Sequence, residues 1–217
     1  MSYLDSRDND IDTTEWIDIY TALKALKPGR DELIVELCAG KGYLIRFLGE
    51  RIPSRIIGVD LEGCRYSRDV ECLNLALEDP PQADIYVFQH CIEHLPQERA
   101  KCILKRALVH GRAVVGILPG HHVDDPTHKI NHYHIIEIKS IIDYVRPPYY
   151  VVRPDIRSYA YPGTLDYLLV MSNTPIRKED TVPRRLALLV KAYRSILARS
   201  FTPKPPQHIG IGGGRHG

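Results

Sequence analysis

The sequence predicts an α/β fold, a doubly wound and mostly parallel seven-stranded sheet with helices on both faces and an antiparallel last strand. Three observations support this fold class. Short apolar runs alternate along the chain with segments whose apolar residues recur at helical spacing. The runs are apolar at consecutive positions, which is typical of strands buried on both faces of a parallel sheet. A glycine-containing turn joins the first run to the next helical segment, as expected for strand–helix–strand units.

The first half of the chain begins with a helix and continues with alternating strands and helices. Apolar residues from Trp16 to Leu26 recur at helical spacing, and Pro28-Gly29 ends this helix. Little room remains for a helix between Asp60 and Val70. The elements expected in this half are helices over 14–27 and 43–48 and strands over 33–37, 56–60 and 84–88, with a further strand inside 70–77.

The second half continues the pattern and changes character after Pro175. The turn at Pro162-Gly163 predicts that the strands on either side of it pair antiparallel. We expect one domain over 1–175, which includes the N-terminal helix, then a basic helical extension over 176–201 and a disordered tail over 202–217. The remaining elements are helices over 96–109 and 135–145 and strands over 112–118, 149–152 (with an extension toward Tyr159) and 166–172.

The composition is that of an ordinary globular protein. Of 217 residues, 44% are hydrophobic and 26% are charged, which excludes a collagen-like or wholly disordered chain. No apolar run is long enough to cross a bilayer, and the polar, acidic N-terminus does not resemble a secretory signal. An odd number of cysteines without a CxxC pair predicts neither a disulfide framework nor a structural zinc site, and favours a cytoplasmic location. The cysteines are Cys38, Cys64, Cys72, Cys91 and Cys102.

The charge is distributed unevenly along the chain. The net charge is +2, but residues 181–217 contain seven Lys and Arg residues and no acid, so residues 1–180 carry −5. A basic C-terminal helix over 184–199 is compatible with a polyanionic partner such as nucleic acid. A solvated helix face explains the same charges more simply.

The segment from Glu36 to Tyr43 is the most informative part of the sequence. It lies between a buried strand and a helix, and its small residues allow a sharp turn and a close approach of the backbone to a ligand. Asp60 stands at the carboxyl end of the next strand, where an acid is suited to bind both hydroxyls of a ribose. Because ligands bind at the carboxyl ends of the strands in such sheets, we expect the loop and Asp60 to share one crevice.

Four segments, in the right order, resemble those of the class I S-adenosylmethionine-dependent methyltransferases over residues 30–172. Glu36-Leu-Cys-Ala-Gly-Lys-Gly42 is similar to the acid-x-Gly-x-Gly-x-Gly loop of that family, with Cys38 in place of the first glycine. Ile57-Gly-Val-Asp60 is similar to the second motif. The other two segments are Asp84-Ile-Tyr-Val-Phe-Gln-His-Cys-Ile-Glu-His-Leu-Pro96 and Asp125-Pro-Thr-His128 with the apolar helix after it.

The resemblance implies a binding site for S-adenosylmethionine, with S-adenosylhomocysteine as the product. Glu36 is implied near the amino-acid end of the cofactor and Asp60 at its ribose, with Leu61 beside the adenine. Asn74 takes the place where the family often has an acid that binds the adenine amino group. The implied cofactor-binding residues are Glu36, Cys38, Ala39, Gly40, Gly42, Tyr43, Asp60, Leu61, Asn74, Leu75, Gln89 and His90.

The implied reaction is methyl transfer from S-adenosylmethionine to a nucleophilic acceptor by in-line displacement. A base is needed where the nucleophile must lose a proton, and histidine suits this role. Eight of the ten histidines lie between positions 90 and 134. His90 directly follows the fourth strand, and His121 and His122 follow the fifth. The candidate catalytic residues are therefore His90 and His121.

Other functions remain open at this point. His90, His94 and the segment 121–128 contain nitrogen and carboxylate ligands that suit zinc, as in a His/Asp metal-dependent hydrolase, but neither HExxH nor His-x-His-x-Asp-His is present. The expected site therefore contains no metal. A catalytically silent cofactor- or nucleic-acid-binding module is a further alternative. The glycine spacing disfavours a dehydrogenase.

The sequence does not identify the acceptor or other partners. Gln89-His90-Cys91-Ile92 stands where methyltransferases of nucleic-acid amino groups often have Asn/Asp-Pro-Pro-aromatic, which disfavours that reaction. A small molecule, the ribose of an RNA and a protein remain open as acceptors, and no membrane contact is expected. The apolar stripe of the C-terminal helix is compatible with a homodimer.

Overall fold

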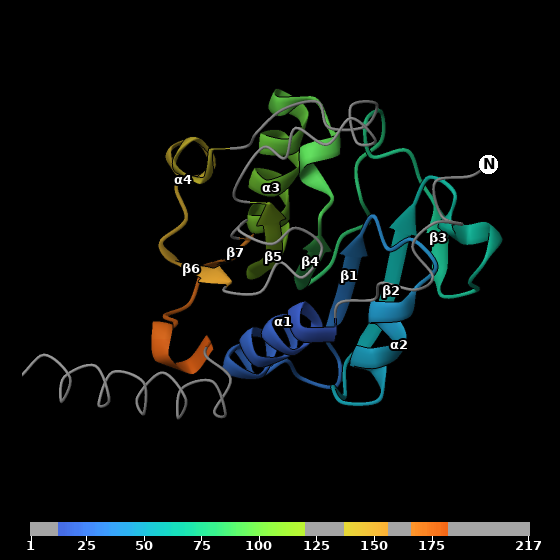
Figure 1. Cartoon of the computed structure of the whole chain (residues 1–217), viewed down its shortest axis with the longest axis horizontal. Coiled ribbons are helices and arrows are strands. Elements are labelled where there is room, and N and C mark those ends of the chain that lie inside the picture. Colours follow the sequence, from blue (N-terminus) through green and yellow to red (C-terminus); the bar gives the residue numbers. More distant parts are fainter. Residues whose placement is uncertain (1–12, 120–136, 156–165, 182–217) are drawn as a thin grey trace, which may run out of the picture. The chain divides into compact units, whose positions relative to one another are not determined.

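The computed structural model describes residues 13–119, 137–155 and 166–181 (Figure 1). These residues belong to one compact unit, Met1–Pro183. The second unit, Arg184–Gly217, lies outside the described residues, and so do the basic helix and the tail expected there. The segment 120–136, which contains His121, His122 and His128, is also outside them.

The described residues contain a seven-stranded sheet with the order β3-β2-β1-β4-β5-β7-β6. Neighbouring strands from β3 to β5 pair parallel, whereas β7 pairs antiparallel with both β5 and β6. Both the mostly parallel sheet and the antiparallel last strand are thus confirmed. The strands are β1 (Leu33–Leu37), β2 (Arg55–Asp60), β3 (Val70–Cys72), β4 (Ile85–Gln89), β5 (Ala113–Pro119), β6 (Tyr149–Asp155) and β7 (Asp166–Ser172).

Helices cover both faces of the sheet (Figure 1). One apolar cluster joins α1 and α2 to one face, and a second joins α3 and α4 to the other. The α-helices are α1 (Thr13–Leu26), α2 (Tyr43–Gly49), α3 (Gln97–His110) and α4 (Ile138–Val145), and the short 3₁₀ helices are η2 (Gly63–Arg65), η3 (Ile92–His94) and η4 (Lys178–Thr181). Only η2 lies between β2 and β3, in agreement with the short segment predicted after Asp60.

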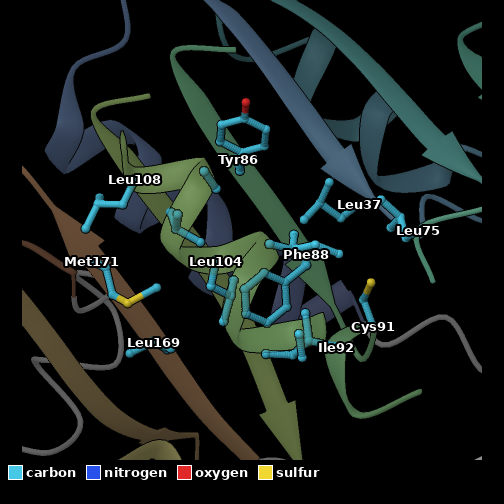
Figure 2. Packing of buried hydrophobic residues seen from close by; sticks show 14 of the residues in the cluster. Leu37, Leu75, Tyr86, Phe88, Cys91, Ile92, Leu104, Leu108, Leu169 and Met171 are labelled. Atoms are coloured by element: carbon cyan, nitrogen blue, oxygen red, sulfur yellow. The ribbon is translucent and has the colours of Figure 1, made fainter. Parts of the chain in front are cut away.

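The central strands are apolar at consecutive positions because each face needs its own core. Ile34 packs in the cluster under α1 and α2, whereas its neighbour Val35 packs in the cluster under α3. Figure 2 shows Phe88 of β4 between Leu37 and Ile92, in the apolar cluster under α3 and α4. The Phe88 ring lies so close to β5 that a Cβ at Gly116 would stand 2.0 Å from its nearest atom. The end of β4 is therefore fixed by close packing.

The cysteines correct one prediction. Cys38 forms a disulfide with Cys91, and Cys64 forms one with Cys72, so the expectation of no disulfide framework was wrong. The Cα–Cα distances of 5.5 and 5.1 Å are ordinary for disulfides. An odd number of cysteines leaves one unpaired, and this is Cys102 on α3. Cys38 and Cys91 meet because β1 and β4 are neighbouring strands. Neither the number of cysteines nor their spacing in the sequence reveals this pairing of strands.

Among the described residues, no helix combines the length and apolar character that a membrane span requires.

Candidate active site

The strand order reverses between β1 and β4, and the candidate site lies at the carboxyl ends of these strands. β1 has β2 on one side and β4 on the other, although β4 is not the next strand in the sequence. In an open α/β sheet, such a point leaves a crevice between the loops that follow the two central strands. Figure 1 shows β1, β2 and β4 with their arrowheads at the same edge. Glu36, Asp60 and His90 lie at or just past these ends.

The loop after β1 has alternate residues in the left-handed region. The φ angles are 55° at Cys38, 52° at Gly40 and 76° at Gly42. Glycine adopts this conformation without steric cost, whereas cysteine does not. Cys38 thus has a backbone conformation that glycine adopts readily, and its side chain is joined to Cys91 by a disulfide. Tyr43 then begins α2.

Hydrogen bonds hold this loop against β2. The Ala39 N–H donates to the carbonyl of Val59 at 3.1 Å, and the Gly42 N–H donates to the carbonyl of Ala39 at 2.9 Å. Gly42 occupies the position before α2 without a side-chain cap.

Glu36 is a buried acid at the end of β1. It is 4% exposed, and its Oε2 has no hydrogen-bond partner among the described residues. Burial raises the pKa of the Glu36 carboxyl well above its usual range, the negative charge of Asp60 adds to this, and a hydrogen bond from the backbone of Ile45 opposes it. A buried carboxyl oxygen without a partner is costly, and a cationic ligand would relieve that cost.

Asp60 ties the turn after β2 to the glycine loop. Its Oδ2 accepts a hydrogen bond from the Gly40 N–H at 3.0 Å. Its Oδ1 accepts hydrogen bonds from the N–H groups of Glu62 and Gly63, each at 2.8 Å. The two loops touch, because a Cβ at Gly63 would stand 2.0 Å from the Gly40 carbonyl oxygen. Leu61 is 63% exposed beside them.

Asn74 and Leu75 lie beyond β3. The Asn74 side-chain oxygen accepts a hydrogen bond from the Ala76 N–H at 3.0 Å, which forms a local turn. Leu75 is 5% exposed and belongs to the core cluster under α3. Asn74 thus has a structural role in its own turn, and Leu75 has one in the core.

The end of β4 brings Gln89 and His90 to α1. Trp16 donates a hydrogen bond from Nε1 to the Gln89 Oε1 at 3.0 Å, and Gln89 donates in turn to the Glu15 carboxylate. His90 has a φ of 48°, and its Nε2 lies 3.1 Å from the Oε1 of Glu15. Its Nδ1 lies 3.4 Å from the Oε1 of Glu93. One imidazole is therefore placed between two buried carboxylates.

Comparison with known proteins supports the fold assignment. No family model matches the chain, and no curated protein matches its sequence. Its structure is similar to a 1,6-didemethyltoxoflavin-N1-methyltransferase from Burkholderia thailandensis solved with its ligand and S-adenosylhomocysteine, with a TM-score of 0.58, 18% identity and coverage of 80% of this chain and 84% of that one. It is also similar to the magnesium protoporphyrin IX methyltransferase of Synechocystis PCC 6803 with bound SAH, with a TM-score of 0.57, 12% identity and coverage of 80% and 88%.

A third similar structure is an S-adenosylmethionine-dependent methyltransferase from Methanosarcina mazei, with a TM-score of 0.54, 12% identity and coverage of 69% of this chain and 96% of that one. The sheet order and the antiparallel β7 are the methyltransferase topology. The chain has the class I S-adenosylmethionine-dependent methyltransferase fold.

Within this methyltransferase fold, His90 carries a proton more readily than an ordinary histidine. Burial lowers the pKa of His90, but the hydrogen bond of Glu15 and the negative charges of Glu15 and Glu93 outweigh it and raise the pKa well above its usual value. For Glu15, burial raises the pKa. The hydrogen bond and charge of His90, with hydrogen bonds to Gln89 and Asp166, outweigh that effect and lower it. The carboxylates of Glu15 and Glu93 therefore favour the protonated form of this imidazole.

Two residues of the candidate site belong to no motif in the sequence. Glu15 comes from the first turn of α1 and Asp166 from the first residue of β7, and both lie within ion-pair distance of His90, at 3.1 and 3.9 Å from its Nε2. Glu15 stands four positions before Ile19, on the apolar side of the expected helix, which is the one sequence signal for it. No sequence signal distinguishes Asp166. His121 lies outside the described residues, so its role stays a prediction.

Proposed function

We propose that this protein transfers a methyl group from S-adenosylmethionine to a nucleophilic acceptor. One observation carries the proposal: Glu36, the left-handed loop 38–42 and Asp60 converge at the carboxyl ends of β1 and β2 in a protein with the methyltransferase fold. The solved structures with bound S-adenosylhomocysteine support this choice of cofactor.

The residues at the strand ends suit the cofactor chemically. The buried Oε2 of Glu36 lacks a partner, and the ammonium of an amino acid is a donor that would satisfy it. The Asp60 carboxylate accepts three backbone hydrogen bonds and has further lone-pair capacity for ribose hydroxyls. When bound, S-adenosylmethionine supplies an activated methyl group on a sulfonium. The role of the chain is then to hold the acceptor in line with that methyl group.

We assign the acceptor to the space at the end of β4, next to His90. This strand end lies beside the cofactor loop, because the disulfide between Cys38 and Cys91 joins the two loops directly. His90, Glu15 and Asp166 are the polar groups gathered there. An acceptor that must lose a proton, such as a hydroxyl, gains most from these groups.

Production of S-adenosylhomocysteine in the presence of an acceptor tests the reaction. Purified protein is incubated with methyl-labelled S-adenosylmethionine and, in separate reactions, with phenolic and aliphatic hydroxyl compounds, amines, RNA and protein. The proposal predicts acceptor-dependent label transfer in one of these classes, abolished by excess S-adenosylhomocysteine. If S-adenosylhomocysteine binds but no class is ever labelled, the chain is a cofactor-binding module and the proposed reaction is wrong.

Asp60→Ala is expected to weaken S-adenosylhomocysteine binding by at least about tenfold, the cost of about one charged hydrogen bond. The substitution removes the ribose acceptor and leaves the N–H groups of Gly40, Glu62 and Gly63 without it. Calorimetric titration measures the affinity. Asp69→Ala, which changes an exposed acid on the same loop, is the matched control and should bind as the wild type does. An unchanged affinity in Asp60→Ala would refute the ribose assignment.

Glu36→Gln is expected to raise the stability of the ligand-free protein while weakening the cofactor by at least about tenfold. The raised pKa means that the folded state holds a proton on Glu36 more tightly than the unfolded state does. Wild-type stability therefore falls as pH rises from about 4.5 toward the folded pKa, and glutamine removes this dependence. Melting curves from pH 4 to 8 with and without S-adenosylhomocysteine measure both effects. A variant that is less stable at pH 7 and binds normally would contradict both assignments.

A further inference from the structure

The cluster at the end of β4 offers three ligand atoms from three distant parts of the chain. Glu15 comes from α1, His90 from the residue after β4 and Asp166 from the start of β7. One side-chain atom from each lies within 4.8 Å of the others. Glu15 and Asp166 are 4% and 5% exposed. The fold thus assembles a small, buried set of two carboxylates and one imidazole.

The spacing of these atoms suits a common centre. The Nε2 of His90 lies 3.1 Å from the Oε1 of Glu15 and 3.9 Å from the Oδ2 of Asp166. Ligands bound to one tetrahedral ion at about 2.1 Å lie about 3.4 Å apart. The observed distances lie on either side of this value, so a small displacement of each side chain forms a coordination sphere.

The charges around His90 favour a cation. Three carboxylates face this one imidazole, namely those of Glu15, Glu93 and Asp166, and each of these residues is at most 5% exposed. Buried carboxylates in excess are costly unless a cation or a proton neutralises them.

Glu93 provides an independent observation. It is 1% exposed, and neither of its carboxyl oxygens has a hydrogen-bond partner in the described part of the chain. Its Oε1 lies 3.4 Å from the Nδ1 of His90, on the ring edge opposite to Glu15. A carboxylate at Nδ1 is the group that orients a metal-binding histidine and directs its Nε2 lone pair toward the ion. Glu93 is therefore a positioning residue.

We propose that Glu15, His90 and Asp166 bind one divalent transition-metal ion, Zn²⁺ or Mn²⁺. One imidazole and two carboxylates suit these ions better than Mg²⁺ or Ca²⁺, which prefer oxygen ligands alone. Three protein ligands leave a coordination position open, as in catalytic metal sites. The sequence favoured a site without metal, and its zinc alternative used His90 and His94 with the segment 121–128. Glu15 and Asp166 are new to this assignment, which does not depend on methyl transfer.

Direct metal titration tests the site in the full chain. Protein stripped with EDTA is titrated with ZnCl₂ and with MnCl₂ in the absence of S-adenosylmethionine. Calorimetry measures binding of each ion, and melting temperatures measure the stabilisation. Glu15→Gln and Asp166→Asn remove one ligand each and keep the shape of the side chain, and two variants are used so that one remains if the other does not fold. Glu98→Gln alters an exposed acid on α3 and is the matched control.

The expected result is one ion per chain in the wild type and in Glu98→Gln, with a metal-dependent rise in melting temperature. Each ligand variant should bind this ion at least 100-fold more weakly and lose the metal-dependent stabilisation. Unchanged affinity in a folded ligand variant would show that the ion binds elsewhere, and absence of Zn²⁺ and Mn²⁺ binding to the wild type would overturn the proposal. Titration with S-adenosylhomocysteine is independent of this result, so failure of the metal site and failure of the cofactor assignment are distinguishable.

Discussion

Reduction of the disulfide between Cys38 and Cys91 is expected to lower the free energy of unfolding by about 4 kcal/mol. The two cysteines are 53 residues apart, so the bond removes much of the freedom of the unfolded chain. The pair from Cys64 to Cys72 spans 8 residues and should contribute about 2.5 kcal/mol. The disulfide between Cys38 and Cys91 also joins the loop after β1 to the end of β4. Cofactor affinity should therefore fall when this disulfide is reduced.

Melting curves of Cys91→Ser and of Cys102→Ser measure this contribution. Cys102 is unpaired and partly buried on α3, which makes it the matched control. We expect the melting temperature of Cys91→Ser to fall by roughly 8–16 °C and that of Cys102→Ser to stay nearly unchanged. Five free thiols in the oxidised wild type, or equal melting temperatures for the two variants, would contradict the disulfide assignment.

His90→Ala is expected to lower methyl transfer by at least about 100-fold, the usual contribution of a proton-transfer group, while cofactor affinity stays within about twofold. His90 contacts Glu15, Glu93 and Asp166 at the strand end that we propose for the acceptor, whereas Asp60 accepts a hydrogen bond from Gly40 of the glycine loop. The same loss is expected whether His90 acts on the proton of the acceptor or binds a metal ion. The metal titration described above separates these two roles.

The assay for His90 uses the acceptor identified with labelled cofactor and S-adenosylhomocysteine titration in parallel. His110→Ala is the control, because His110 is an exposed histidine at the last turn of α3. It should retain wild-type turnover. Full activity of His90→Ala would remove His90 from the acceptor site, and loss of cofactor binding would show that its role is structural.

Much of the fold could be predicted because the central strands are buried on both faces. Four of the five residues in Leu33–Leu37 are apolar, Glu36 being the exception, and the predicted bounds of this run agree with those of β1. The third strand was harder to bound, because β3 has three residues and only Val70 is buried. The absence of a full helix between β2 and β3 followed from length alone, and η2 occupies that segment.

The candidate site was predicted only where neighbours in sequence are also neighbours in space. Glu36 and the glycine loop follow one strand directly, so a motif describes them. Glu15 and Asp166 meet His90 across 75 and 76 sequence positions, since α1 and β7 both pack around the central strands. The pairing of Cys38 with Cys91 depends on the same long-range arrangement. Such contacts have no local sequence pattern.

Asn74 illustrates the limit of a resemblance carried over by position. The resemblance implies a contact with adenine, whereas the structure gives its side-chain oxygen a hydrogen bond with the Ala76 N–H. That bond fixes a turn without the cofactor. An adenine contact at Asn74 therefore stays a prediction, and a substitution that removes its side-chain amide would test this contact.

Calorimetric titration of the wild-type protein with S-adenosylhomocysteine tests the central claim most directly, with NAD as the matched control. Both ligands carry an adenosine ribose, but only S-adenosylhomocysteine carries the amino-acid end that the partnerless carboxyl oxygen of Glu36 would bind. The account predicts one S-adenosylhomocysteine per chain with micromolar affinity and no detectable NAD binding. Absence of S-adenosylhomocysteine binding, or equal affinity for NAD, would contradict it.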